Sequence, residues 1–255
     1  MTQVEAGKTP GLVWLVGAST GIGRALAIEL AHQGWQVAVS SRRREALQEL
    51  VAEQSGIHAF PGDVTDAPGM QALAEQIETS LGPIEMAIFN QGDYEPMGVD
   101  AFDVALFRRI MEINYMGVVH GLAAVLPSMR ARRRGRIFVT ASLAGYRGLP
   151  NAAPYGASKA AVINMLESLR PELQAEGIAL RVINPGFVKT PMTAKNTFEM
   201  PFLIETDAAV KAIMKELDGS HFEIAFPKSF AWIMKTLRVL PDWLFFRLTA
   251  RMLDR

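Results

Sequence analysis

Short apolar runs alternate along the chain with longer stretches in which apolar residues recur every three or four positions. The short runs show little polar alternation, which is typical of strands buried on both faces of a sheet. Leu12 to Val16, which ends at Gly17, is the first of them. The pattern predicts strands over residues 12–16, 35–40, 57–60, 84–89, 136–140, 178–183 and 222–226.

The longer stretches have the periodicity of amphipathic helices. In residues 44–54, for example, Leu47, Leu50 and Val51 fall on one stripe of the helix surface. The same pattern predicts helices over residues 24–33, 44–54, 71–80, 155–176 and 208–217, with one or two further helices over 102–126.

Strands and helices alternate over the whole chain, and this order implies parallel strands joined by right-handed crossovers. Such connections place helices on both faces of the sheet. We therefore expect residues 1–255 to form a single doubly wound, Rossmann-type α/β domain with a seven-stranded, mostly parallel sheet. No linker-like stretch or internal repeat divides the chain.

The composition is that of an ordinary globular protein, with 49% hydrophobic and 20% charged residues. The 26 Lys and Arg residues balance the 26 Asp and Glu residues, so the net charge gives no basis for binding nucleic acid. The absence of cysteine excludes disulfides and thiolate metal ligands. Residues 1–9 lack the apolar core of a secretion signal. We expect a cytoplasmic protein without a metal centre.

A turn of small residues lies between the first predicted strand and the first predicted helix. Small side chains let the backbone approach a pyrophosphate, whose charge is favoured at a helix N-terminus. The alternative is a merely tight turn, but the position after the first strand of an alternating fold favours dinucleotide binding. The candidate residues are Gly17-Ala18-Ser19-Thr20-Gly21-Ile22-Gly23.

The end of the second predicted strand indicates which dinucleotide is preferred. A site for NAD places a carboxylate there, whereas a 2′-phosphate requires a cation. The sequence has Ser41 followed by Arg42, Arg43 and Arg44 and no acidic residue. We therefore expect NADP(H) to be preferred over NAD(H), with Arg42 as the phosphate ligand and Ser41 assisting. Arg43 and Arg44 are expected to form the solvated start of a helix.

Asp63 and Val64 follow the third predicted strand. The Asp63 carboxylate is a candidate acceptor for the adenine amino group. An Asx turn or a helix cap is the alternative explanation for an aspartate at this position.

Tyr155 and Lys159 are four residues apart within a predicted helix, so their side chains share a face. An unperturbed tyrosine has a pKa of about 10, and a neighbouring ammonium lowers that pKa toward working pH. The pair is therefore a candidate general acid and base. On its spacing alone the pair is weak evidence, because tyrosine and lysine lie four residues apart on many solvated helix faces.

Taken together, residues 11–192 resemble the short-chain dehydrogenase/reductase family. Asn114 matches the catalytic asparagine of that family, and Ser142 lies thirteen residues before Tyr155, as the catalytic serine of the family does. The resemblance also implies cofactor contacts from the segments that follow the fourth and sixth strands. Those residues are Asn90, Gly92, Pro185, Gly186, Val188 and Thr190.

The resemblance implies an NADP-dependent carbonyl reductase or alcohol dehydrogenase. In the implied mechanism Ser142 hydrogen-bonds the substrate carbonyl, and Tyr155 donates a proton as the nicotinamide delivers hydride. Lys159 lowers the pKa of Tyr155 and hydrogen-bonds the nicotinamide ribose. Asn114 holds a water that connects Lys159 to solvent. Tyr155 and Lys159 thus belong to the catalytic set and also to the cofactor site.

Two departures from the family pattern affect these expectations. Gln91 stands where the family has a smaller alanine, which puts the local cofactor contacts in doubt. The chain also lacks the glycine-rich final strand through which many relatives form tetramers. We expect a homodimer instead, acting on a small-molecule carbonyl or alcohol.

Residues 228–255 form an apolar C-terminal extension, interrupted by Pro241 and by charges that argue against a membrane-spanning helix. Three interpretations remain open. The extension covers the substrate cleft or packs on the core, it pairs two subunits, or it makes a peripheral membrane contact. Residues 193–206 are the expected substrate lid, with an apolar lining. An apolar cover favours an apolar substrate.

Two rival classes of function share parts of this pattern. One is a non-catalytic NADP(H)-binding interaction protein of the same fold, which has no need of Ser142, Tyr155 and Lys159 together. The other is a nucleotide-sugar epimerase or dehydratase, for which 255 residues leave little room for a substrate domain.

Overall fold

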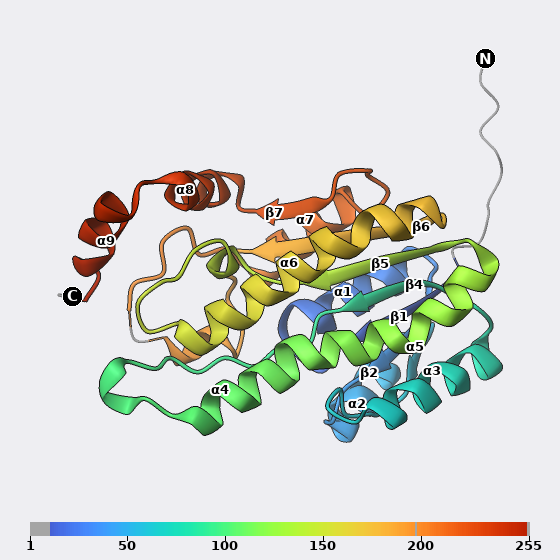
Figure 1. Ribbon diagram of the computed structural model, residues 1–255. Helices are drawn as coiled ribbons and strands as arrows, with labels where there is room; N and C mark the ends of the chain where they lie inside the picture. Colours follow the sequence, from blue (N-terminus) through green and yellow to red (C-terminus); the bar gives the residue numbers. More distant parts are fainter. Residues whose placement is uncertain (1–10, 197, 254–255) are drawn as a thin grey trace, which may run out of the picture.

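A parallel sheet forms the centre of the molecule in a computed structural model, which describes residues 11–196 and 198–253 (Figure 1). The seven strands lie in the order β3-β2-β1-β4-β5-β6-β7, and every neighbouring pair is parallel. The expected doubly wound α/β architecture is confirmed. The strands are β1 (Leu12–Val16), β2 (Gln36–Ser40), β3 (Ile57–Ala59), β4 (Ile84–Phe89), β5 (Gly135–Thr140), β6 (Ile178–Pro185) and β7 (Glu223–Phe226).

Helices cover both faces of this sheet. Helices α3, α5, α6 and α8 pack on one face, and α1, α2 and α7 pack on the other. Strand β1 shows why both faces are apolar: Trp14 enters the first core and its neighbour Leu15 enters the second. The helices are α1 (Gly21–His32), α2 (Arg44–Glu53), α3 (Ala67–Leu81), α4 (Val104–Met111), α5 (Gly117–Arg132), α6 (Ala153–Ala175), α7 (Thr206–Lys215), α8 (Lys228–Val239) and α9 (Asp242–Ala250).

The strand order reverses at β1, which pairs with β2 on one side and with β4 on the other. Crossovers leave β1 and β4 on opposite sides of the sheet, so a crevice opens beyond their carboxyl ends. The glycine turn that follows β1 and the residues that follow β4, β5 and β6 all lie at this edge. The topology therefore gathers the candidate residues from distant parts of the chain.

Helix α3 begins four residues before the predicted boundary. The side chain of Asp66 accepts a hydrogen bond from the amide of Gly69, and Pro68 occupies the first turn. Both features are standard at a helix start, and they extend the helix beyond its apolar periodicity.

The predicted helical region 102–126 consists of three parts. Helices α4 and α5 are joined by the π-helical turn Glu112–Met116, and α5 continues to Arg132. Among the described residues, the run Val104–Arg132 is the one helix long and apolar enough to pass a composition test for a membrane span. It packs in the core through Val118 and Leu122, so we interpret it as a core helix.

Candidate active site

The turn between β1 and α1 packs backbone against backbone. Gly17 has a φ of 85°, and a Cβ on it would lie 2.6 Å from the amide nitrogen of Gln91. A Cβ on Gly23 would lie 2.1 Å from the carbonyl oxygen of Gly17. Asn90 donates from Nδ2 to that same carbonyl over 3.3 Å. The turn is thus held against the end of β4 without any intervening side chain.

The N-terminus of α1 faces the crevice beside this turn. Thr20 occupies the N-cap position without a side-chain capping bond, and the first turn of the helix carries no acidic residue. Ser19 and Ile22 are half-buried next to it. A Cβ on Gly21 would lie 3.0 Å from the Thr190 side chain, so the loop after β6 closes the other side. Such a helix end favours an anion.

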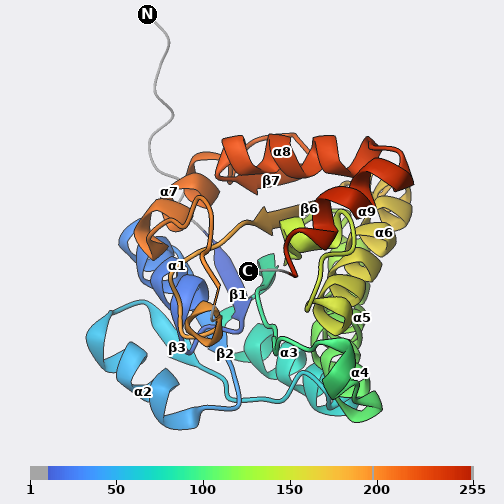
Figure 2. The same ribbon diagram turned by 90° about the vertical axis from the view of Figure 1, so that its left-hand side faces the viewer.

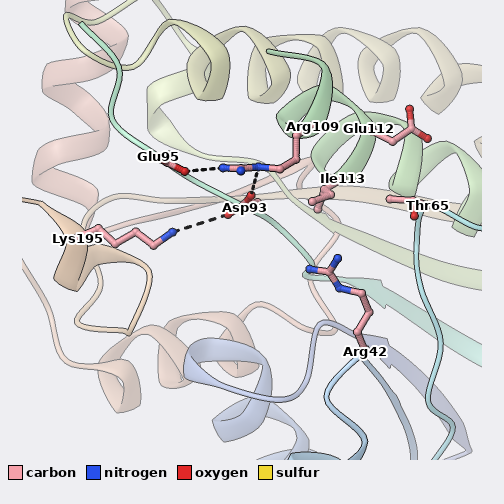
Figure 3. Close-up of a pocket in the computed structure, with 8 residues that line it drawn as sticks. All are labelled: Arg42, Thr65, Asp93, Glu95, Arg109, Glu112, Ile113 and Lys195. Carbon is pink, nitrogen blue, oxygen red and sulfur yellow. Dashed lines mark hydrogen bonds and ion pairs between the residues drawn. The ribbon is translucent and has the colours of Figure 1, made fainter. Parts of the chain in front are cut away.

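A cavity of about 540 Å³ lies beyond the ends of β2 and β3 (Figure 3). The exposed side chain of Arg42 reaches into it from one side. Across the cavity, Asp93 pairs with Arg109 at 3.1 Å and lies 3.9 Å from the Lys195 ammonium. In residues 11–196 and 198–253, Arg42 has no carboxylate within ion-pair distance. The lining comprises Arg42, Thr65, Asp93, Glu95, Arg109, Glu112, Ile113 and Lys195.

Ser41 does not point its hydroxyl freely into this cavity. Its Oγ accepts a hydrogen bond of 3.1 Å from the amide of Arg43. Arg43 is the N-cap residue of α2 and Arg44 is its first residue, and both are exposed, as predicted. Of the three arginines, Arg42 is thus the one directed at the cavity.

Asp63 forms the Asx turn that was the alternative explanation for this residue. Its Oδ1 accepts hydrogen bonds from the amide and hydroxyl of Thr65, at 3.0 and 2.9 Å. Val64 packs against α5 at Gly117, where a Cβ would lie 2.9 Å from its side chain. This packing holds the Asp63 segment at the rim of the crevice, where a second carboxylate oxygen of Asp63 is not used by the turn.

The segment after β5 brings Ser142 to the start of α6. Ser142 is 9% exposed, and its Oγ accepts from the amide of Ala144 and lies 3.4 Å from the Pro185 carbonyl oxygen. A Cβ on Gly145 would lie 2.8 Å from the backbone of Lys159, so this segment packs directly on α6. The approach sets the Ser142 hydroxyl close enough to Tyr155 to lower the pKa of the phenol.

Lys159 is buried beneath Tyr155 on the same helix. Its Nζ lies 5.7 Å from the centre of the Tyr155 ring and donates to the carbonyl oxygen of Thr140 over 2.9 Å. Gly92 packs on the other side, where a Cβ would lie 3.5 Å from Nζ and 3.6 Å from Oδ1 of Asn114. Gly92 thus lies in van der Waals range of both Lys159 and Asn114.

Asn114 lies in the middle of the π-helical turn and is fully buried. Its Oδ1 accepts from the amide of Asp93 at 2.7 Å, and its Nδ2 donates to the Asp93 carbonyl and to Ser158 Oγ. Ser158 in turn donates to the carbonyl of Tyr155. π-Helical turns are frequent at functional sites, and this one ties the residues after β4 to the stretch of α6 that carries Tyr155 and Lys159.

The pKa values of this pair differ from the sequence-based expectation. Burial raises the pKa of Tyr155 to about 12, against the opposing effect of the Ser142 hydrogen bond, and the neighbouring Tyr94 contributes to the rise. Burial lowers the pKa of Lys159 to about 8. The expected lowering of the Tyr155 pKa by Lys159 is therefore wrong for this structure. The reason is that desolvation dominates, while Lys159 donates to Thr140 rather than to the phenol.

The loop after β6 completes the arrangement. The amide of Gly186 donates to Phe226 of β7 over 2.7 Å, and the carbonyl of Val188 accepts from Thr193 Oγ1 over 2.6 Å. The amide of Thr190 also donates to Thr193 Oγ1. The segment that connects the end of β6 to the predicted lid therefore contains four of the predicted cofactor residues, namely Pro185, Gly186, Val188 and Thr190.

The family model described as short chain dehydrogenase matches residues 12–200 of this chain. An uncharacterized oxidoreductase of Myxococcus xanthus is 37% identical over 235 residues, which cover 91% of this chain and 93% of the relative. This chain belongs to the short-chain dehydrogenase family. It is therefore an oxidoreductase, as the sequence resemblance implies.

Solved structures of short-chain dehydrogenases share the fold. A short chain dehydrogenase/reductase from Burkholderia phymatum in complex with NAD gives a TM-score of 0.82 at 21% identity, covering 90% of this chain and 93% of the other. An alcohol dehydrogenase from Thermococcus sibiricus complexed with 5-hydroxy-NADP gives 0.77 at 22% identity, covering 85% and 95%. The family uses a nicotinamide cofactor, and these two complexes contain different forms of it.

Sequence reasoning missed one aromatic residue of this short-chain dehydrogenase site. Tyr94 lies edge-on to Tyr155, with ring centres 5.1 Å apart, and its hydroxyl donates to Oδ1 of Asn196 in the lid over 2.8 Å. Burial raises the pKa of Tyr94, so it stays protonated. Its position two residues after Gly92 was the signal that could have identified it.

Gln91 of this short-chain dehydrogenase has an unusual environment. It is 7% exposed, and neither polar atom of its side-chain amide has a hydrogen-bond partner among the described residues. An unpaired buried amide costs about 1–3 kcal/mol. Gln91 thus departs from the alanine of the family pattern with a polar amide in a buried position.

Proposed function

We propose that this short-chain dehydrogenase is an NADP(H)-dependent oxidoreductase that interconverts an apolar carbonyl compound and the corresponding secondary alcohol. One observation carries the proposal. Ser142, Tyr155 and Lys159 meet at the carboxyl edge of the sheet, and the glycine turn of β1 lies at the same edge. A proton donor and a dinucleotide-binding turn are thus brought to one crevice.

The residues of the crevice fit a nicotinamide dinucleotide. Cβ atoms on Gly17 or Gly23 would collide with backbone atoms, so the turn keeps its bare backbone next to the N-terminus of α1. Residues 17–23 would hold the pyrophosphate, and Val188 and Thr190 would hold the nicotinamide carboxamide. When bound, the nicotinamide supplies or accepts the hydride.

Arg42 supports the preference for NADP(H). It is exposed, it has no carboxylate partner in the described part of the chain, and it lines a cavity with Thr65 and Ile113. A guanidinium in that place is a strong ligand for a 2′-phosphate. Asp63 would accept from the adenine at the same end.

The catalytic side chains have separate tasks in this proposal. Ser142 donates a hydrogen bond to the carbonyl oxygen of the substrate, which holds that oxygen beside Tyr155. Tyr155, with its pKa of about 12, is protonated at neutral pH and donates the proton in the reductive direction. In the oxidative direction the phenolate accepts it. Lys159 and Asn114 flank Gly92, and there we place the water-mediated path that returns a proton from solvent.

The lid supports an apolar substrate. Phe187 stacks on Phe230 of α8 with ring centres 5.7 Å apart, and Phe198 and Phe202 of the lid pack on these two rings. This aromatic cluster joins the loop that follows β6 to the start of α8. It supplies the apolar rings that we assign to the substrate side of the crevice.

Replacement of Tyr155 by Phe tests the function directly. Loss of the general acid should lower turnover of an accepted ketone about a thousandfold. The measurement is NADPH absorbance with a panel of ketones from small to steroid-sized. Tyr94→Phe is the matched control, because it removes a hydroxyl from the same crevice without removing the proton donor. Undiminished turnover by Tyr155→Phe would sink the mechanism and favour a non-catalytic role for the pair.

Replacement of Arg42 by Ala tests the cofactor preference. The change should weaken NADPH binding about thirtyfold, since a charge-assisted hydrogen bond is worth about 1.5–3 kcal/mol, and should leave NADH binding unchanged. Arg43→Ala, at the exposed N-cap of α2, serves as the control. Equal effects of Arg42→Ala on the two dinucleotides, measured by fluorescence titration, would refute the 2′-phosphate role.

A further inference from the structure

The two C-terminal helices expose large apolar side chains on the face opposite to the one they bury. In α8, Ala231 and Met234 enter the core, while Trp232 is 71% and Val239 is 78% exposed. Trp232 and Val239 are seven residues apart and so share one face of the helix. Apolar side chains of a helix that is packed on all sides would be far less exposed than these two.

Helix α9 repeats the arrangement. Phe245 and Thr249 are buried, while Trp243 is 70% and Phe246 is 63% exposed. The residues that follow the helix, Met252 and Leu253, continue the exposed apolar surface. We refer to the exposed side chains of residues 228–253 as the tail surface. Figure 2 shows both helices on the side of the molecule where the carboxyl edge of the sheet lies.

The tail surface is fixed in place by contacts from its opposite side. The guanidinium of Arg147 donates to the carbonyls of Leu237 and Leu240 at 2.9 and 2.6 Å, pairs with Asp242, and lies 3.9 Å over the Phe245 ring. Lys235 pairs with Glu223 of β7. The apolar side chains thus face outward from helices that are already docked, and not from a detached segment.

Basic residues predominate among the charges of this segment. Among residues 228–253 there are five basic residues and one acidic residue, Asp242, which is paired with Arg147. The segment therefore carries a net charge of +4, although the chain as a whole is neutral. In the described structure, no carboxylate lies within 4.0 Å of Lys228, Arg238, Arg247 or Arg251. The basic residues are Lys228, Lys235, Arg238, Arg247 and Arg251.

The exposed aromatic side chains and the excess of basic residues together indicate which partner binds the tail surface. A second copy of the chain, related by a two-fold axis, would place the same cations against each other, which is unfavourable. An anionic bilayer attracts each basic residue and accepts tryptophan side chains at the level of its headgroups. We propose that the tail surface is a docking site for anionic lipid membranes, with Trp232 and Trp243 inserted at the interface.

Docking in this way would place the lid next to the lipid. Phe230, the third residue of α8, stacks on Phe202 of the lid with ring centres 5.6 Å apart. The aromatic cluster of the lid therefore continues directly into the tail surface. Membrane docking requires only the exposed apolar side chains and the basic residues of the tail surface, so it does not depend on which substrate the enzyme uses.

Co-sedimentation of the full-length protein with vesicles tests the proposal. We expect binding to phosphatidylcholine vesicles that contain phosphatidylglycerol and much weaker binding to pure phosphatidylcholine. The double variant Trp232→Ala/Trp243→Ala should lower the partition coefficient for the anionic vesicles at least tenfold. Arg247→Gln should lower it about fivefold, since one basic residue near such a surface contributes about 1 kcal/mol. Phe102→Ala, which truncates an exposed aromatic residue outside residues 228–253, should leave binding unchanged.

Three results would overturn the proposal. One is failure of the full-length protein to bind anionic vesicles, and another is equal binding to anionic and neutral vesicles. The third is a stable dimer that the double variant converts to monomer in gel filtration while vesicle binding is absent, because this result would assign the tail surface to a second copy. Circular dichroism of each variant checks that the fold is intact.

Discussion

The glycine turn after β1 and the tail helices α8 and α9 are held in place by different kinds of contact. In the turn, the backbone at Gly17 and Gly23 touches the backbone of neighbouring segments directly. In the tail, one arginine, Arg147, joins the end of α8 to α9 through its side chain, and much of the other face is exposed. The turn therefore does not accommodate larger side chains at Gly17 and Gly23, whereas the exposed positions of the tail do.

Because of this difference, we expect the chemistry that the family shares to depend on the first region and the substrate specificity of this chain to depend on the second. The residues proposed for cofactor binding and proton transfer lie among backbone contacts and buried side chains such as Asn114 and Lys159, where a substitution disturbs several partners at once. The lid and tail rest on aromatic stacking and on the contacts of one half-buried arginine, Arg147, which other side chains could replace. The features that distinguish this enzyme from its relatives are therefore expected to lie in the second region.

The largest effect should come from Gly23→Ala. The new methyl group would lie 2.1 Å from a carbonyl oxygen of the turn, so we expect a loss of about 3 kcal/mol in the free energy of unfolding. Gly148→Ala is the control, because a Cβ there would meet nothing within 4 Å and should change stability by less than about 1 kcal/mol. Chemical denaturation measures both. If the two variants were equally stable, the backbone at Gly23 would be no more tightly packed than the backbone at Gly148.

A pH-dependent effect of similar size should come from Lys159. The pKa of Lys159 falls from 10.5 to about 8 on folding, which corresponds to about 3 kcal/mol. Because the unfolded chain binds this proton more tightly, stability should rise with pH from about 8 toward 10.5. The raised pKa of Tyr155 acts in the opposite direction above pH 10, so denaturation is best compared between pH 7 and 10.

The variant Lys159→Met should lack this rise. It keeps the approximate length of the side chain and removes the charge, so the unfolding free energy of the wild type should increase relative to that of the variant as pH rises from 7 to 10. A constant difference over that range would show that Lys159 remains charged in the folded protein.

The smallest effect should come from Arg147→Ala. Loss of its carbonyl contacts and its Asp242 pair should raise the amide exchange rates of α9 about thirtyfold, equivalent to about 2 kcal/mol of local stability. Global unfolding should change little. Arg238→Ala, an exposed arginine of the same helix pair, is the control. Loss of global stability in Arg147→Ala would mean that the tail is as integral to the fold as the glycine turn.

Local patterns were sufficient to predict the sheet, most of the helices and the gathering of the site residues. Apolar runs identified the strands, and the family motifs identified Ser142, Tyr155 and Lys159. The π-helical turn escaped prediction because one extra residue per turn leaves the apolar pattern of 102–126 almost unchanged. The raised pKa of Tyr155 also escaped prediction. The spacing shows that a lysine is near, but it does not show that this lysine donates to Thr140 or that burial affects both side chains.

Arg147 has a consequence for engineering. It lies five residues after Ser142, in the segment that positions the serine, and it also holds the end of α8. Deleting the tail would leave its guanidinium without these acceptors and would open the core at Met234. The C-terminal helices are therefore not a detachable module: swapping tails between relatives will require transplanting the 142–147 segment with them.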